Sequence, residues 1–327
     1  MKKLLCEPQF LCNSVPALSN GNGLKYIQFK YHIPPLLKLI LLYSLVVPNF
    51  HFKYNCLKIF TLIITLTFFA DVQSQALREP LAVKYAGLGA YSKSFSDIFS
   101  GTANQASLAQ LSSAAFGVYG ERRFMLDELN NYAAIIAVPT TSGTIGLQAD
   151  YFGSSDYNEN RIGLIYARKL SSKIDAGVKF NYHSIKVAGY GTASTVNFEG
   201  GVLFHLTEKL HAGIQIYNPT SSKFNKAGTD KLASEYKFGL GYEASKNVFL
   251  STEIVKQEDK DVGVNVGLQY NVHEKVLLRG GISTIGNNSF LGMGLRLNLG
   301  RIDINAAYHP QLGFTPGMLL IINLKKS

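Results

Sequence analysis

Short segments in which apolar and polar residues alternate strictly recur from about residue 115 to the C-terminus. The clearest is KIDAGVKFNYH, residues 173–183, where Ile174, Ala176, Val178, Phe180 and Tyr182 alternate with Asp175, Gly177, Lys179, Asn181 and His183. A period of two places successive side chains on opposite faces of a β-strand. Such segments begin near residues 115, 131, 143, 160, 173, 195, 209, 234, 247, 261, 275, 289, 301 and 314. The pattern therefore predicts about fourteen strands.

The connections between these segments form two alternating sets. Short, turn-like connections lie at 170–173, 206–209, 244–247 and 298–301, and generally longer ones at 153–160, 186–195 and 218–231. Short turns on one rim, longer loops on the other and an even number of strands of about ten residues are typical of an outer-membrane β-barrel. We predict an all-β fold: a transmembrane antiparallel up-and-down barrel over residues 115–325. The alternative is a soluble β-sandwich or propeller, whose strands also alternate.

In such a barrel, every second side chain contacts lipid and the others face the lumen. We expect the inward polar groups to pair across the lumen and to anchor a plug rather than to form a selective filter. The predicted lumen-facing polar residues are Asp175, Lys179, Asn181, His183, Asn265, Gln269, Arg296, Asp303 and Asn305. Tyrosines near strand ends are expected to form an aromatic belt at the membrane interface, namely Tyr151, Tyr182, Tyr217, Tyr242, Tyr270 and Tyr308.

The residues before the first strand are candidates for the plug. A barrel of about fourteen strands encloses more space than its own wall can fill. Residues 75–114 are rich in Gly, Ala and Ser and contain no well-alternating strand. We expect this segment to lie inside the barrel as a plug or hatch.

Residues 57–74, LKIFTLIITLTFFADVQS, have the build of a secretory signal peptide. A lysine precedes an apolar run, and a polar tail with small residues follows it. We expect export and cleavage after Ser74. The alternative treats 34–48 and 59–70 as two inner-membrane segments, although each uninterrupted apolar run is shorter than the ~20 residues of a spanning helix.

Residues 1–56 stand before this signal and call for an explanation. There is no methionine between Met1 and Met125, so we hypothesise that a TTG codon at Leu57 starts translation and that residues 1–56 are an upstream extension translated in error. All three cysteines lie in that extension. A cysteine-free remainder suits an exported protein.

Charge and motif content exclude several functions. Residues 1–74 hold seven lysines against Glu7 and Asp71, and so carry half of the formal net charge of +10. No basic cluster after them indicates nucleic-acid binding. The sequence has no G-x-S-x-G elbow, and the histidines His183, His205, His211, His273 and His309 lack metal-ligand spacing. We expect no enzymatic activity, no catalytic residues, no cofactor and no metal site.

The predicted plug carries a resemblance to a known group. Ala86-Gly87-Leu88-Gly89-Ala90, then Asp97, then Asn104-Gln105-Ala106-Ser107-Leu108-Ala109 follow the order "aGmGgA", acidic residue, "NPAgLa". This resembles the outer-membrane barrels grouped around the fatty-acid transporter FadL and the type IX secretion proteins PorV and PorQ. Gln105 and Ser107 depart from the motif, as does the non-aromatic end Asn323-Leu324-Lys325. The resemblance implies a fourteen-stranded barrel with an internal N-terminal segment, a Bacteroidetes-like source, and Gly87, Gly89, Asp97, Asn104, Ala106 and Leu108 as plug-motif residues.

Two functions follow from this resemblance. The first is a PorV- or PorQ-like accessory of protein secretion or surface-protein handling, with secretion-system proteins as partners. The second is a FadL-like transporter or channel for small hydrophobic solutes. Short predicted outer loops leave little room for a ligand cup, which favours the first. Both place the protein among outer-membrane lipids of a Gram-negative bacterium, without a nucleic-acid partner.

Overall fold

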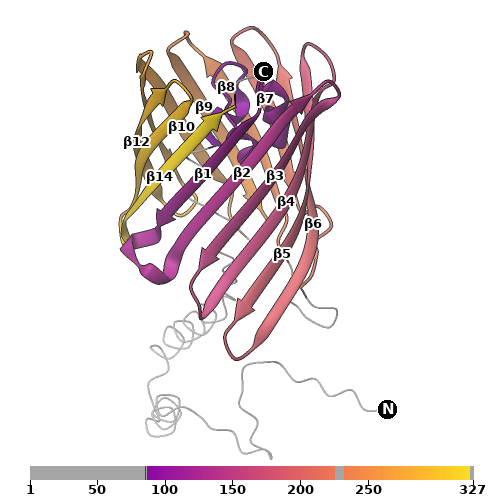
Figure 1. The fold of residues 1–327 in the computed structure, drawn as a ribbon, viewed down its shortest axis with the longest axis vertical. Helices are drawn as coiled ribbons and strands as arrows, with labels where there is room; N and C mark the ends of the chain where they lie inside the picture. The colour runs from indigo at the N-terminus through magenta and orange to yellow at the C-terminus, as the bar shows by residue number, and fades with distance from the viewer. Residues whose placement is uncertain (1–84, 86, 225–231, 259, 325–327) are drawn as a thin grey trace, which may run out of the picture. The chain divides into compact units, whose positions relative to one another are not determined.

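The computed structural model describes residues 85, 87–224, 232–258 and 260–324. Fourteen antiparallel strands within them form a closed barrel in chain order (Figure 1). They are β1 (Ala115–Arg122), β2 (Asn130–Thr140), β3 (Gly143–Gly153), β4 (Tyr157–Lys169), β5 (Ile174–Val187), β6 (Gly191–His205), β7 (Leu210–Tyr217), β8 (Glu235–Glu243), β9 (Val248–Gln257), β10 (Gly263–His273), β11 (Val276–Ser283), β12 (Asn288–Leu297), β13 (Gly300–His309) and β14 (Gly313–Asn323). The predicted all-β barrel is confirmed.

Closure is made by the first and last strands, which lie side by side in Figure 1. Their pairing runs from Ala115 opposite Asn323 to Glu121 opposite Gly317, so the sheet has no open edge there. Every strand begins within four residues of its predicted start. The predictions for residues 1–56 and 57–74, and for the first ten residues of the plug, 75–84, lie outside the described residues.

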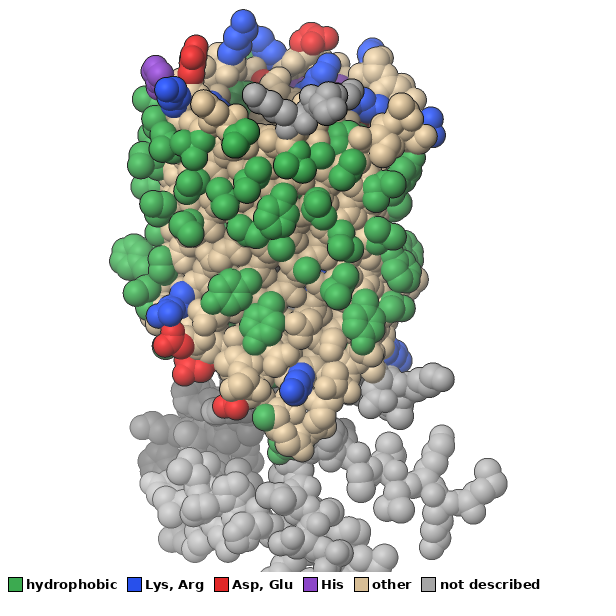
Figure 2. Space-filling model, in the orientation of Figure 1, with side chains coloured by type: hydrophobic (Ala, Val, Ile, Leu, Met, Phe, Trp, Pro, Cys, Tyr) green, Lys and Arg blue, Asp and Glu red, His purple; other side chains and the backbone are tan. Residues whose placement is uncertain are grey.

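The two faces of the wall differ in polarity. On β5, Val178 and Phe180 are each 57% exposed, whereas Lys179 between them is 2% exposed. On the face seen in Figure 2, apolar side chains lie across the middle of the barrel, and charged side chains lie toward its two ends. Since hydrocarbon offers no water to unpaired backbone groups, a closed sheet with an apolar outer face is the form in which strands cross a membrane. Among the described residues, no helix has the length and hydropathy to cross one.

Two of the three longer loops, 153–160 and 186–195, are shorter than predicted. Most of the predicted loop 186–195 is strand, because β5 runs to Val187 and β6 starts at Gly191, and these two residues pair. The predicted loop 153–160 shrinks to residues 154–156. These strand ends are polar and small, so they carry backbone pairing without the apolar alternation by which a strand is recognised.

Residues 87–111, called here the inner segment, pack against the inside of the wall. They form three short helical turns, η2 (Gly87–Tyr91), α4 (Ser100–Ala103) and η3 (Gln105–Gln110), drawn in indigo within the barrel in Figure 1. Two further turns, η4 (Arg123–Met125) and η5 (Asp127–Leu129), connect β1 to β2. Apolar residues of the inner segment share one cluster with inward side chains of the wall: Ile98, Phe99, Leu108 and Ala109 with Ala115, Tyr119, Ile135, Ala137, Ile165, Ala167, Leu319 and Ile321.

Glycines on the inward face of the strands make room for this segment. A Cβ on Gly177 would lie 2.5 Å from the carbonyl carbon of Gln105, and one on Gly241 would lie 1.8 Å from the carbonyl oxygen of Tyr91. Real Cβ contacts are not that short, so any side chain at these positions would displace the segment. Glycine is therefore the residue that allows the close approach of two backbones.

Candidate functional site

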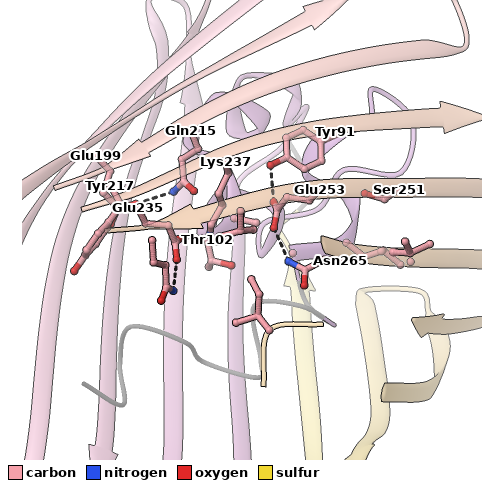
Figure 3. A pocket seen from close by; sticks show the side chains of 18 of the residues that line it. Tyr91, Thr102, Glu199, Gln215, Tyr217, Glu235, Lys237, Ser251, Glu253 and Asn265 are labelled. Atoms are coloured by element: carbon pink, nitrogen blue, oxygen red, sulfur yellow. Dashed lines mark hydrogen bonds and ion pairs between the residues drawn. The ribbon is translucent and has the colours of Figure 1, made fainter. Parts of the chain in front are cut away.

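A cavity of about 90 Å³ lies between the inner segment and the wall. Its lining comes from η2 and α4 on one side and mainly from β6 to β10 on the other (Figure 3). Twelve of the twenty residues that line it are polar or charged: Tyr91, Thr102, Arg161, Glu199, Gln215, Tyr217, Glu235, Lys237, Ser251, Glu253, Gln257 and Asn265. Strand alternation produces this set of polar residues, because the inward positions that surround the cavity are polar on successive strands.

Most charges around the cavity are paired within the wall. Arg161 Nε lies 2.8 Å from Asp150 Oδ2, and Lys237 Nζ lies 2.9 Å from Glu235 Oε1. Lys179, which is buried behind the lining, lies 3.4 Å from Glu199 Oε1. A buried charge is stable only when it is paired or hydrogen-bonded, and these three pairs meet that condition.

Glu253 on β9 is held differently. Its Oε2 accepts a hydrogen bond of 2.6 Å from the Tyr91 hydroxyl of the inner segment, and its Oε1 accepts one of 2.8 Å from Asn265 Nδ2. Both donors are uncharged. Among the described residues Glu253 forms no ion pair, although the Lys237 ammonium, which is paired with Glu235, also interacts with it electrostatically.

Tyr217 corrects one prediction. We expected it in the outer aromatic belt, but it is 7% exposed, lines the cavity and lies 3.2 Å from His183 Nε2. Its place follows from the alternation of β7, which turns Tyr217 to the same face as Gln215. Tyr182, Tyr242, Tyr270 and Tyr308 are exposed on the outside, as expected.

Asp97 fastens the inner segment to one side of the wall. Its Oδ2 lies 3.0 Å from Arg279 Nη2 of β11 and 2.8 Å from Arg301 Nη2 of β13. Burial by itself would raise the pKa of the Asp97 carboxyl, but the guanidinium groups of Arg301 and Arg279 outweigh burial and hold this pKa below its ordinary value. Asp97 therefore stays charged in contact with two arginines.

A second attachment lies at the short-turn end. Glu243 Oε1 on β8 accepts hydrogen bonds from Ser92 Oγ at 2.7 Å, from the Lys93 amide at 2.8 Å and from the Ser94 amide at 2.9 Å. The same oxygen lies 3.1 Å from His211 Nε2. This end of the inner segment is thus held by a single carboxylate that is itself supported by a histidine.

The structure places the predicted plug-motif residues in the barrel interior. Gly87, Gly89, Asn104, Ala106 and Leu108 are buried, and Asp97 is partly buried against its arginines. Asn104 Oδ1 caps η3 by accepting from the Ala106 amide at 3.0 Å. A Cβ on Gly89 would lie 2.3 Å from the Phe95 carbonyl oxygen, which explains a glycine there.

The predicted lumen residues also take inward positions, but they do not form one site. Asp175, Lys179, Asn181, His183, Gln269, Asp303 and Asn305 are buried, Asn265 lines the cavity, and Arg296 lies partly exposed near the short-turn rim, bonded to Asn271. Of these nine, the cavity lining includes Asn265. Sequence reasoning did not single out Glu253, Tyr91, Glu243 or the His205–His211 pair as a site. For the residues of the wall, the available signal was their position on the inward face of an alternating strand.

Similar folds occur among solved structures. CymD, described as a monoaromatic hydrocarbon channel, aligns with a TM-score of 0.57 at 12% identity, covering 76% of this chain and 97% of that one. The toluene transporter TodX of P. putida aligns at 0.54 and 10% identity, covering 75% and 99%. The toluene transporter TbuX of Ralstonia pickettii aligns at 0.52 and 10% identity, covering 74% and 96%.

These likenesses concern the fold. No protein-family model matches the chain, and no curated protein matches its sequence. The predicted barrel architecture is shared with these hydrocarbon and toluene conduits, whereas the PorV or PorQ type finds no support in these comparisons. At 10–12% identity, the substrates of the neighbours are not carried over to this chain.

Proposed function

We propose that this protein is an outer-membrane transporter or channel for small solutes, of the FadL-like kind, in a Gram-negative bacterium. Export by a cleaved signal peptide at 57–74 and the absence of enzymatic activity are parts of the same proposal. The fold shared with CymD, TodX and TbuX, which are named as hydrocarbon or toluene conduits, favours transport over the secretion-accessory function.

One observation carries the proposal. The lumen is occupied by a segment that is held by hydrogen bonds, ion pairs and packing, and that leaves a cavity against the wall. A barrel of this width encloses either an open channel or a plugged lumen, and here the inner segment packs against the inward glycines as a plug. Displacing that segment then opens the lumen without breaking the barrel.

The test is solute entry into liposomes that contain the purified protein. We expect faster swelling in small solutes than in empty liposomes, and faster still with Asp97→Asn, which removes the charge that two arginines hold. Asp127→Asn is the matched control, because its pair with Arg122 lies on the surface, with side chains 49% and 72% exposed. Swelling no faster than empty liposomes for both the wild type and Asp97→Asn, with both folded by heat-modifiable gel mobility, would contradict the proposal.

A further inference from the structure

We infer that the cavity beside Glu253 binds a small organic cation with N–H donors, such as a protonated primary amine. This inference rests on the proposed function, because it names the solute class of the same lumen. It departs from the hydrocarbon and toluene substrates named for the structural neighbours.

The charges leave one negative charge uncompensated. Asp150, Glu199 and Glu235 have the partners Arg161, Lys179 and Lys237 at 2.8–3.4 Å. Glu253 is bonded only to neutral donors among the described residues. A partly buried carboxylate is stabilised by a nearby cation. Lys237 is shared between Glu235 and Glu253, so four carboxylates around the cavity face three cationic side chains and a further cation would be favoured.

Two amide side chains in the lining add unpaired acceptor oxygens. Asn265 must turn Nδ2 toward the Glu253 carboxylate, which fixes the orientation of its amide and leaves Oδ1 without a donor. Gln215 donates Nε2 to Glu199 in the same way, and its Oε1 has no partner either. Both oxygens make the electrostatic potential of the cavity more negative. An amine supplies both a further positive charge and N–H donors for these unpaired oxygens.

The size of the cavity and its unpaired acceptors oppose an apolar solute. A cavity of about 90 Å³ is smaller than the apolar cavities of roughly 150 Å³ that hold benzene, and carboxylates dominate its charged lining. A hydrocarbon there would leave Glu253 and the amide oxygens without partners. A metal ion is less suited than an amine, because no group of three His, Cys, Asp or Glu in the described part of the chain is placed to hold one.

Direct binding tests this inference. Isothermal titration of the detergent-solubilised protein would use ethylammonium chloride, with ethanol as the uncharged counterpart and sodium chloride at equal ionic strength. We expect ethylammonium to bind and Glu253→Gln to weaken it at least tenfold, because glutamine still accepts from Tyr91 but carries no charge. Glu274→Gln, an exposed acid on a short turn, is the matched control and should bind like the wild type.

Several results would overturn the inference. They are equal binding by the wild type and Glu253→Gln, no binding of ethylammonium by the wild type, or binding of toluene or Ca²⁺ in its place. The liposome assay separates this failure from failure of the proposed function. Solute entry without a charge preference would support the proposed transport function and contradict the cation site. Charge-dependent binding without solute entry would support the cation site and contradict the transport function.

Discussion

His205 and His211 face each other with their Nδ1 atoms 3.0 Å apart, across the hairpin of β6 and β7. Each ring also contacts a carboxylate through its other nitrogen: His205 Nε2 lies 2.8 Å from Asp175 Oδ2, and His211 Nε2 lies 3.1 Å from Glu243 Oε1. The four side chains therefore form one continuous chain of contacts from Asp175 on β5 to Glu243 on β8.

This chain predicts an effect of His211 on the inner segment. In His211→Ala, Glu243 loses the ring that supports it, so its bonds to the Lys93 and Ser94 amides should weaken by about 1–3 kcal/mol. Hydrogen exchange at these two amides should be at least fivefold faster than in the wild type. His273→Ala, on the exposed rim, should leave exchange unchanged. Equal protection in His211→Ala and the wild type would show that the histidine does not support the attachment.

Removing the charge of Asp97 should destabilise the attachment of the inner segment to β11 and β13 by a larger free energy. Asp97→Asn leaves the buried Arg279 and Arg301 without their shared carboxylate. Breaking a buried pair on one side costs about 3–5 kcal/mol, and partial exposure lowers this to about 2–4 kcal/mol here. Limited proteolysis should therefore cleave the inner segment of Asp97→Asn much faster than that of the wild type. Asp127→Asn should cost less than about 1 kcal/mol, because its ion pair is exposed.

The same carboxylate predicts a pH dependence with a definite sign. The arginines lower the pKa of Asp97 in the folded state, so its stabilisation is complete above the ordinary carboxyl range near pH 4 and is lost as pH falls through the lower folded value. The difference in proteolysis between wild type and Asp97→Asn should stay constant from pH 7 to about pH 5. It should shrink only in stronger acid. A difference that already disappears near pH 6 would contradict this assignment.

Glycine positions give a test of fit between wall and segment. In Gly201→Ala, the new Cβ would lie 2.2 Å from Asn104 Oδ1, whereas Gly200 on the other face has nothing within 4 Å. We expect Gly201→Ala to cost about 1–3 kcal/mol by overpacking and to expose the inner segment to protease. Gly200→Ala should be neutral. Thermal unfolding of both variants, with gel mobility as the check on the barrel, measures the difference.

The sequence by itself determined the architecture. Period-two alternation set the strand positions and decided which side chains face out. The reason is that lipid contacts only the outer face of the wall, so apolar residues occupy every second position. The sequence also marked a small-residue segment before the first strand as the candidate filling of the lumen. The alternation was lost beyond the apolar band, and the extended ends of β5 and β6 were therefore mistaken for a loop.

Only the tertiary structure decided which inward groups meet. The alternation of β9 and β10 places Glu253 and Asn265 in the lumen. It does not predict their contact with Tyr91, which lies 162 residues before Glu253 in the chain. Asp97 likewise finds Arg279 and Arg301 only after the barrel has closed around the inner segment. Alternation fixes the face of a side chain, whereas strand register, closure and the seating of the inner segment fix its height and its neighbours. The unpaired charge of the cavity is a property of that assembly.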